Sequence, residues 1–192
     1  MHEGIVSETL VQNLAAEGIN LPGSVVQRGI DSYILHMDVG SARIDTPLEE
    51  KRIGAVYRGA GPRDLKDFKF SGLDGHLLRL ALDKGAHLIN ERVTGISLSE
   101  EGYPILGTRS SEPQTYDLVS VTAGVNSPLV KLFEPLGLKY TPPETTKTYL
   151  REYYLGKEKI TQLMGNAIQV FLLEIPRLEF GMLIPKEDYM TV

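Results

Sequence analysis

Residues 116–128 constrain the fold of this chain most, because they predict a strand that turns directly into a helix. The first half of this stretch is mostly apolar, and Gly124 then allows a backbone conformation in which another group can approach closely. Ser127 is a preferred N-cap, and Pro128 suits the first helical position. The free amide groups of such a helix start favour a phosphate. The same turn is common in α/β proteins that bind nothing there, so the pattern alone leaves both interpretations open.

The composition indicates a globular chain. With 42% hydrophobic residues among 192, it has enough apolar side chains for a sizeable core. The formal net charge is -5, and no cluster of Lys and Arg is present, so we expect no nucleic-acid partner. No apolar run approaches the roughly 20 residues that span a bilayer, and the N-terminus lacks a basic region followed by an apolar one. We therefore expect a cytoplasmic protein that does not span a membrane, while contact with a membrane surface stays open.

Cysteine and histidine limit the chemistry of any site. The chain has no cysteine, which excludes a disulfide framework, a thiolate nucleophile and a cysteine metal site. The four histidines lack the paired spacing of metal ligands, and their positions assign no Ser/His/Asp set. We therefore expect no metal site, and the sequence names no catalytic residue.

The first third of the chain predicts antiparallel sheet beside one helix. Ser7 begins that helix, and Gly18 ends it. Val6 and Val11 suit the hydrophobic contact that fixes the entry of the chain into a helix. The remaining elements of this part are strands, expected over residues 32–37, 41–46 and 53–58.

The middle of the chain predicts an α/β layer, and the last third returns to sheet. Asp74 is placed to cap a helix that Gly85 ends, and a strand opens over residues 86–89. A hairpin is expected around Gly102, before the strand over residues 116–123. The elements expected in the last third are strands over residues 148–155, 167–174, 178–184 and 189–192, with a short helix over 157–164.

Residues 70–93, 122–127 and 180–186 together carry a family resemblance. The first stretch resembles a Phe-Asp-x-x-Leu-Leu helix with a Gly-Ala turn and a following strand. The second is similar to an Ala-Asp-Gly-x-x-Ser turn, and the third to a Tyr-x-Trp-x-Phe-Pro strand. These are motifs of the geranylgeranyl reductase group, within the p-hydroxybenzoate hydroxylase-like class of FAD-dependent oxidoreductases. The resemblance covers nearly the whole chain, as the middle of a longer protein.

The resemblance implies an FAD site. The backbone of Val93 matches the position that faces the adenine, and Thr122, Ala123 and Gly124 match the turn near the pyrophosphate. Ala123 stands where the family has an acidic residue, so a carboxylate hydrogen bond at this turn is missing. The backbone contacts of Gly124 do not depend on that side chain.

The resemblance also implies a wall of an apolar substrate pocket, formed by Phe180, Met182, Ile184 and Pro185. Only the spacing and Pro185 are kept from the family strand. Apolar side chains replace most of its aromatic ones, which retains a hydrophobic surface but not the aromatic contacts that shape a particular pocket. The alternative is a half-buried strand without a ligand.

The expected fold class is mixed, α+β and α/β. Residues 1–20 and 68–140 would form part of a three-layer FAD-binding domain, and residues 21–67 and 141–192 an antiparallel-sheet substrate domain that is truncated at its C-terminus. The Gly-x-Gly-x-x-Gly turn of a dinucleotide-binding βαβ unit is absent from the sequence. The chain by itself is therefore expected to bind FAD weakly or not at all, and to be inactive.

The expected function is that of a fragment of an FAD-dependent oxidoreductase. The flavin would exchange a hydride with an apolar substrate, for which the family suggests an isoprenoid, and reduced nicotinamide or another electron donor would serve the flavin. Two alternatives stay open: a non-catalytic module that binds a lipid-like ligand, and an aromatic-ring flavin monooxygenase of the same fold.

Overall fold

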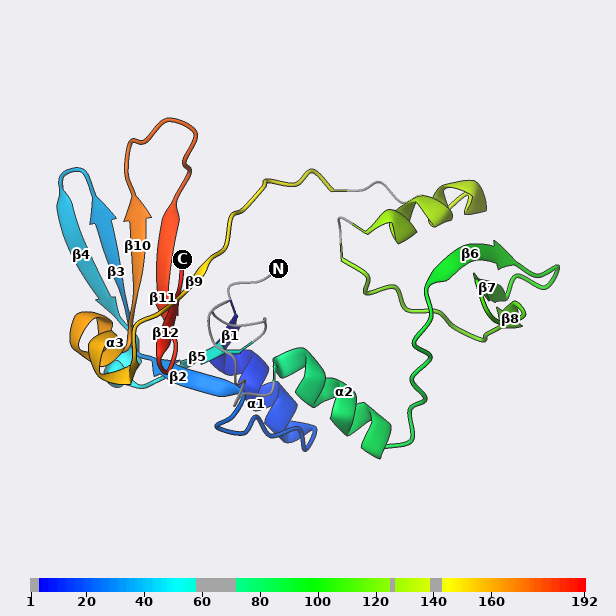
Figure 1. The fold of residues 1–192 in the computed structure, drawn as a ribbon, viewed down its shortest axis with the longest axis horizontal. Coiled ribbons are helices and arrows are strands. Elements are labelled where there is room, and N and C mark those ends of the chain that lie inside the picture. Colours follow the sequence, from blue (N-terminus) through cyan, green and yellow to red (C-terminus); the bar gives the residue numbers. More distant parts are fainter. Residues whose placement is uncertain (1–3, 58–71, 125–126, 139–142) are drawn as a thin grey trace. The chain divides into compact units, whose positions relative to one another are not determined.

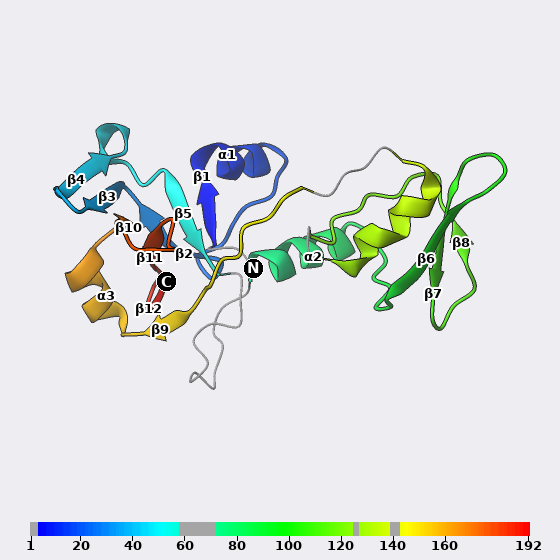
Figure 2. The same cartoon turned by 90° about the horizontal axis from the view of Figure 1, so that it is seen from above.

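The chain forms two compact units in the computed structural model, which describes residues 4–57, 72–124, 127–138 and 143–192. The larger unit comprises residues 1–86 and 148–192, and the smaller unit comprises residues 87–147. Figures 1 and 2 show the helices and strands of both units. Phe70 and Asn126, which belong to the family-like stretches, lie outside the described residues.

This division differs from the one expected from the sequence, which groups residues 1–20 with 68–140. The described residues before Ala86 belong to the larger unit. Leu73 explains the difference, because its backbone N–H donates to Tyr57 O at 2.8 Å and its side chain is buried with Val6 and Val56. The cofactor and substrate roles attached to the expected division stay predictions.

One sheet of the larger unit has three antiparallel strands in the order β1-β5-β2. Its strands and the two helices beside it are β1 (Ile5–Ser7), β2 (Val26–Ile30), β5 (Ile53–Val56), α1 (Glu8–Ala16) and α2 (Leu73–Asp83). Val6, Val25, Val56 and Leu73 form a buried cluster on which Val11 packs. Burial of these side chains fixes both helices against the sheet.

Helix α1 is as the sequence predicts. Ser7 Oγ accepts a hydrogen bond from Leu10 N at 3.3 Å, and Val11 packs against the cluster that contains Val6. Gly18 follows the helix with a φ of +76°, a conformation that favours glycine. Helix α2 ends before Gly85, as predicted, but its N-cap is Gly72, so Asp74 lies in its first turn.

The second sheet of the larger unit has six strands in the order β4-β3-β10-β11-β12-β9. Its strands are β3 (Ser32–Met37), β4 (Gly40–Asp45), β9 (Glu152–Tyr154), β10 (Ala167–Leu172), β11 (Gly181–Pro185) and β12 (Tyr189–Thr191). The β3–β4 hairpin is confirmed, and β3 pairs with β10 in parallel while the other neighbours are antiparallel. The 3₁₀ helix η1 (Pro47–Glu49) follows β4, and α3 (Lys157–Met164) precedes β10.

A second buried cluster joins the two sheets of the larger unit. Ile30 and Ala55 come from the three-stranded sheet, and Ile168 and Ile184 come from the six-stranded sheet. Arg28 on β2 is a polar residue at the same junction.

The smaller unit is an antiparallel meander beside one 3₁₀ helix. Its elements are β6 (Val93–Leu98), β7 (Pro104–Thr108), β8 (Gln114–Thr115) and η2 (Pro128–Leu136). The β6–β7 hairpin is confirmed, and Gly102 in its turn has a φ of +88°. Ser127 caps η2 as predicted, because its Oγ accepts from Leu129 N at 3.3 Å.

Two predicted strands, over residues 86–89 and 116–123, are wrong. Neither stretch is a strand of any sheet that the structure describes, although the N–H of Tyr116 donates to Pro104 O of β7. Their larger apolar side chains are consequently exposed, including Leu88 at 59% and Leu118 at 84%. The α/β layer expected in the middle of the chain is thus replaced by the meander. The fold as a whole mixes helices and sheets, which agrees with the coarse α+β class.

No helix among the described residues combines the length and the apolar character that crossing a bilayer requires.

The guanidinium of Arg28 links β2 to three separate parts of the larger unit. Its Nε donates to Lys186 O at 2.7 Å, and Nη1 donates to Gly165 O at 2.9 Å. Nη2 donates to Thr161 Oγ1 and Glu187 O, each at 3.3 Å. Burial lowers the pKa of Arg28, and the Glu187 carboxylate opposes that effect. The side chain therefore holds α3, the start of β10 and the β11–β12 turn to one strand.

Replacing Arg28 with methionine should lower the free energy of unfolding by about 3 kcal/mol, because backbone acceptors at the junction lose a charged donor. Urea unfolding monitored by circular dichroism measures this. Lys157→Met is the control, since its ion pair with Glu187 is exposed and should contribute no more than about 1 kcal/mol. Equal losses in the two variants would contradict the role of Arg28.

Candidate functional site

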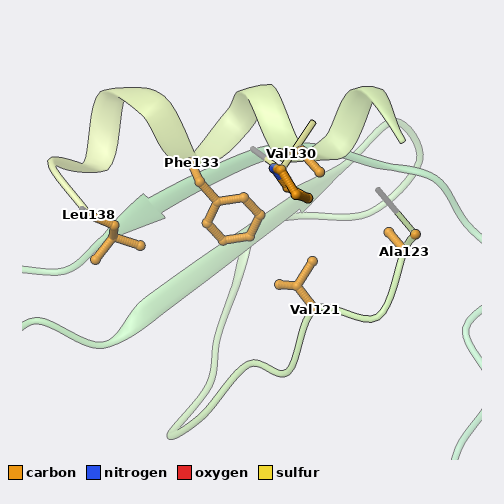
Figure 3. Close-up of a pocket in the computed structure, with 7 residues that line it drawn as sticks. Val121, Ala123, Val130, Phe133 and Leu138 are labelled. Atoms are coloured by element: carbon orange, nitrogen blue, oxygen red, sulfur yellow. The ribbon is translucent and has the colours of Figure 1, made fainter. Parts of the chain in front are cut away.

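The smaller unit contains two adjoining hollows beside η2. The first has a volume of about 380 Å³ and is shown in Figure 3. It is lined by Val121, Ala123, Gly124, Val130, Phe133, Leu138 and Pro143. The second has a volume of about 260 Å³ and is lined by Val93, Ile96, Leu106, Val119, Ser120, Val121, Thr122, Ala123 and Leu129. Val121 and Ala123 line both, so segment 119–124 separates them.

The four residues predicted to bind the cofactor meet at these hollows. Val93 begins β6 and lines the second hollow together with Thr122 and Ala123. Gly124 lines the first hollow. Residues almost thirty positions apart in the sequence therefore share one wall. Whether that wall binds a cofactor stays a prediction.

Sequence reasoning missed the side of the first hollow that η2 provides. Val130 and Phe133 of η2 lie across the hollow from Val121 in Figure 3. The signal was present, because Leu129, Val130 and Phe133 give this short helix an apolar side. The sequence did not place the apolar side of η2 next to the turn 122–124, because the expected strand at 116–123 would have buried segment 119–124 in a sheet.

The described residues give these hollows no charged side chain. Among the lining residues that the structure describes, Ser120 and Thr122 are the ones with a hydroxyl group. At the start of η2, the N–H of Leu129 already donates to Ser127 within the protein. The geometry therefore suits an uncharged apolar or ring-shaped group better than a phosphate.

Gly124 has a φ of +82°, so the left-handed conformation predicted for a close approach is present. A Cβ on Gly124 would meet no atom within 4 Å. The backbone conformation at this position therefore favours glycine, and the space that a Cβ would occupy is open to a ligand. A substitution there would strain the turn without filling a packed contact.

The four residues predicted to bind substrate lie at or near β11 in the larger unit. Ile184 and Pro185 are fully buried, and Ile184 belongs to the cluster that joins the two sheets. Phe180 lies directly before β11 with 46% of its surface exposed, and Met182 is half-buried. Only Phe180 and Met182 are therefore accessible to a substrate.

Met182 belongs to an apolar stretch of the six-stranded sheet. It lies opposite Val170 on β10, which lies beside Leu35 on β3, so the three side chains share one face. One step further along the same face, Met37 and Leu172 pair and are 36% and 43% exposed. We call these five residues the open apolar face. Sequence reasoning found only its β11 member, because the register between β3 and β10 is a tertiary feature.

A group of buried and half-buried titratable residues lies elsewhere in the larger unit. Lys186 is 1% exposed, and its Nζ donates to Gly4 O at 2.8 Å and to Val56 O at 2.9 Å. Burial raises the pKa of Glu152, and the nearby Lys186 charge opposes that effect. Burial also raises the pKa of Tyr189 above its usual range, and Glu152 adds to it. Glu152 on β9 is distant in sequence from Lys186 and Tyr189, and no local sequence pattern indicated that they meet.

No three His, Asp or Glu side chains come together as metal ligands within the ranges that the structure describes.

Replacing Glu152 with glutamine should stabilise the protein at neutral pH. The folded state raises the pKa of this carboxyl, so the wild-type protein loses stability as the pH rises from the unfolded-state value of about 4.3 through the folded-state pKa. The advantage of the variant should therefore be absent near pH 4 and present at pH 7. Urea unfolding at both pH values checks this, with Glu158→Gln on the exposed side of α3 as the control. A variant that is less stable at pH 7 would contradict the assigned cause.

The chain was compared with known proteins, and no protein-family model, no curated protein and no solved structure matches it. The resemblance to the geranylgeranyl reductase group therefore stays a prediction that rests on the motifs alone.

Proposed function

We propose that the smaller unit binds part of an FAD cofactor, in a protein that oxidises or reduces an apolar substrate. One observation carries the proposal. Val93 and the turn of Thr122, Ala123 and Gly124 were selected by resemblance from separate stretches, and they surround the same pair of hollows. Random surface positions have no reason to converge in this way.

The residues present fit one portion of FAD and not another. The apolar linings, including Phe133 and Val121, suit an uncharged ring, because they replace water with hydrocarbon around it. The described lining residues offer the pyrophosphate no cation. We propose that groups other than these residues would balance its charge, and that the chain alone would hold FAD weakly.

When bound, the flavin would supply the redox chemistry by accepting or donating a hydride. The residues of this chain would act by position. Segment 119–124 and η2 would orient a ring and exclude water from it. The open apolar face, with Phe180 beside it, would contact an apolar substrate, for which an isoprenoid is the proposed class. Reduced nicotinamide or another donor would supply the electrons.

A second candidate function is a non-catalytic module for a lipid-like ligand. It is favoured by the first hollow, which has a volume of about 380 Å³ and whose described lining residues are apolar side chains and one glycine. An acyl chain would bind such a lining without needing a partner for a charged group.

Titrating FAD into the ¹⁵N-labelled chain tests the proposal by NMR. We expect the purified chain to be colourless, and added FAD to shift the amides of Val93, Thr122 and Gly124 with a Kd on the order of 1 mM. Ala123→Leu should abolish the shifts, because it narrows both hollows. Ala42→Leu on β4 is the matched control and should leave them unchanged.

The alternatives give different results in the same titration. Shifts at these amides with dodecanoate but not with FAD would support the lipid-binding module. No shift with several millimolar FAD, or shifts that persist in Ala123→Leu, would overturn the cofactor proposal.

A further inference from the structure

Ser41, His36 and Gln169 lie in a row across three neighbouring strands of the larger unit. The Oγ of Ser41 on β4 is 2.9 Å from Nδ1 of His36 on β3. The Nε2 of the same ring is 2.7 Å from Oε1 of Gln169 on β10. A hydroxyl, an imidazole and an amide oxygen in hydrogen-bond contact have the arrangement of a nucleophile, a base and a group that orients the base.

The contact with Gln169 determines which nitrogen of His36 can act as a base. Because Oε1 can only accept, the neutral ring carries its hydrogen on Nε2 and donates it to Gln169. The lone pair then lies on Nδ1, where it accepts the hydroxyl hydrogen of Ser41. This is the tautomer that a base for Ser41 needs.

Stacking holds the plane of the imidazole. The His36 ring lies 4.6 Å from the ring of Phe171, with an interplanar angle of 15°. Phe171 is the register partner of His36 on β10, so two regular strands hold both rings. A base carried on strands is positioned more accurately than one carried on a loop.

Ser41 lies on an edge strand and is exposed. Thr46 N donates to Asp31 O at 2.7 Å, which marks their positions as a hydrogen-bonded pair of the antiparallel ladder. Hydrogen-bonded and non-hydrogen-bonded pairs alternate along an antiparallel ladder. In this register His36 and Ser41 therefore form a pair without ladder hydrogen bonds. The N–H of Ser41 therefore points to the open edge of the sheet, where it can donate to an oxygen of a bound acyl group.

We propose that Ser41 is the nucleophile of an acyl-transfer site, with His36 as its general base and Gln169 as a positioning residue. Neither the family resemblance nor the proposed flavin function involves this site. The nearby Arg43 is not part of the set, because its guanidinium is 2.6 Å from Asp45 and 3.9 Å from Asp31.

The reaction would be the hydrolysis of a small carboxylic ester. Ser41 Oγ bonds to the ester carbonyl carbon, and its proton passes to His36 Nδ1. The bond from that carbon to the leaving oxygen then breaks, and the alcohol departs with the proton. Water, with the same nitrogen as base, releases the acid and restores the serine. Because Ser41 is exposed, the site would accept short acyl groups with little discrimination.

An alkyl fluorophosphonate tests the nucleophile, since it labels activated serines and releases fluoride. We expect one adduct on the folded chain, located at Ser41 by peptide mass spectrometry. Ser41→Ala should remove the adduct, and His36→Phe, which keeps the stacked ring, should slow labelling by about 100-fold. Ser97→Ala is the matched control, because Ser97 is also an exposed serine on a strand, and should label as the wild-type protein does.

The hydrolysis of p-nitrophenyl acetate tests Gln169. Gln169→Leu should lower the rate about tenfold, and Gln169→Glu should restore it, because a carboxylate also accepts from Nε2 and stabilises the imidazolium. A purely structural role would not give this rescue. An absent adduct, adducts on several serines, or equal labelling of the folded and the urea-unfolded chain would overturn the proposal.

Discussion

The hydrogen bonds that Arg28 gives to backbone carbonyls hold the larger unit together, since they join strand β2 to the turn between β11 and β12. The same turn carries Lys186, whose ammonium group donates in the opposite direction, to Gly4 and Val56 of the three-stranded sheet. The β11–β12 turn is therefore held by two cationic side chains: Arg28 donates to the turn, and Lys186 donates from it. Their acceptors are mostly carbonyl oxygens, and a carboxylate lies near each cation, Glu187 near Arg28 and Glu152 near Lys186. The apolar cluster of Ile30, Ala55, Ile168 and Ile184 supplies the buried hydrocarbon surface of the junction, and the two cations add hydrogen bonds across it.

The sequence predicts those helix ends and hairpins that depend on residues close together in the chain. The start of α1 at Ser7 and its end at Gly18 follow from capping rules, and the β3–β4 and β6–β7 hairpins follow from alternation around a turn. The strands expected over residues 86–89 and 116–123 fail for a general reason. A short apolar run becomes a strand only when another strand lies beside it, and the sequence does not specify that partner. The contacts of Arg28 and Lys186, which span more than a hundred residues, have no local signal either.

The candidate sites differ in how much of them could be predicted. Val93 and the turn 122–124 were identified from motifs, but the η2 side of the hollow and the apolar character of its described lining residues needed the structure. The β11 residues were identified from a motif as well, yet Ile184 proved to be core, because strand alternation alone does not say which part of a sheet face another layer covers. The Ser41, His36 and Gln169 set had no motif, since Gln169 is 133 residues from His36.

The parallel pairing of β3 with β10 has a consequence for the order in which the chain folds. Between these strands the chain passes through the whole smaller unit, residues 87–147, which is continuous in sequence. During synthesis the smaller unit can therefore pack from local contacts while β3 and β4 still form an isolated hairpin. The central strands of the six-stranded sheet arrive only afterwards, and loop closure over so long a segment slows folding. Until then the edge of β3 that β10 later covers is unpaired, and this edge is where a nascent chain would be most exposed to wrong strand partners.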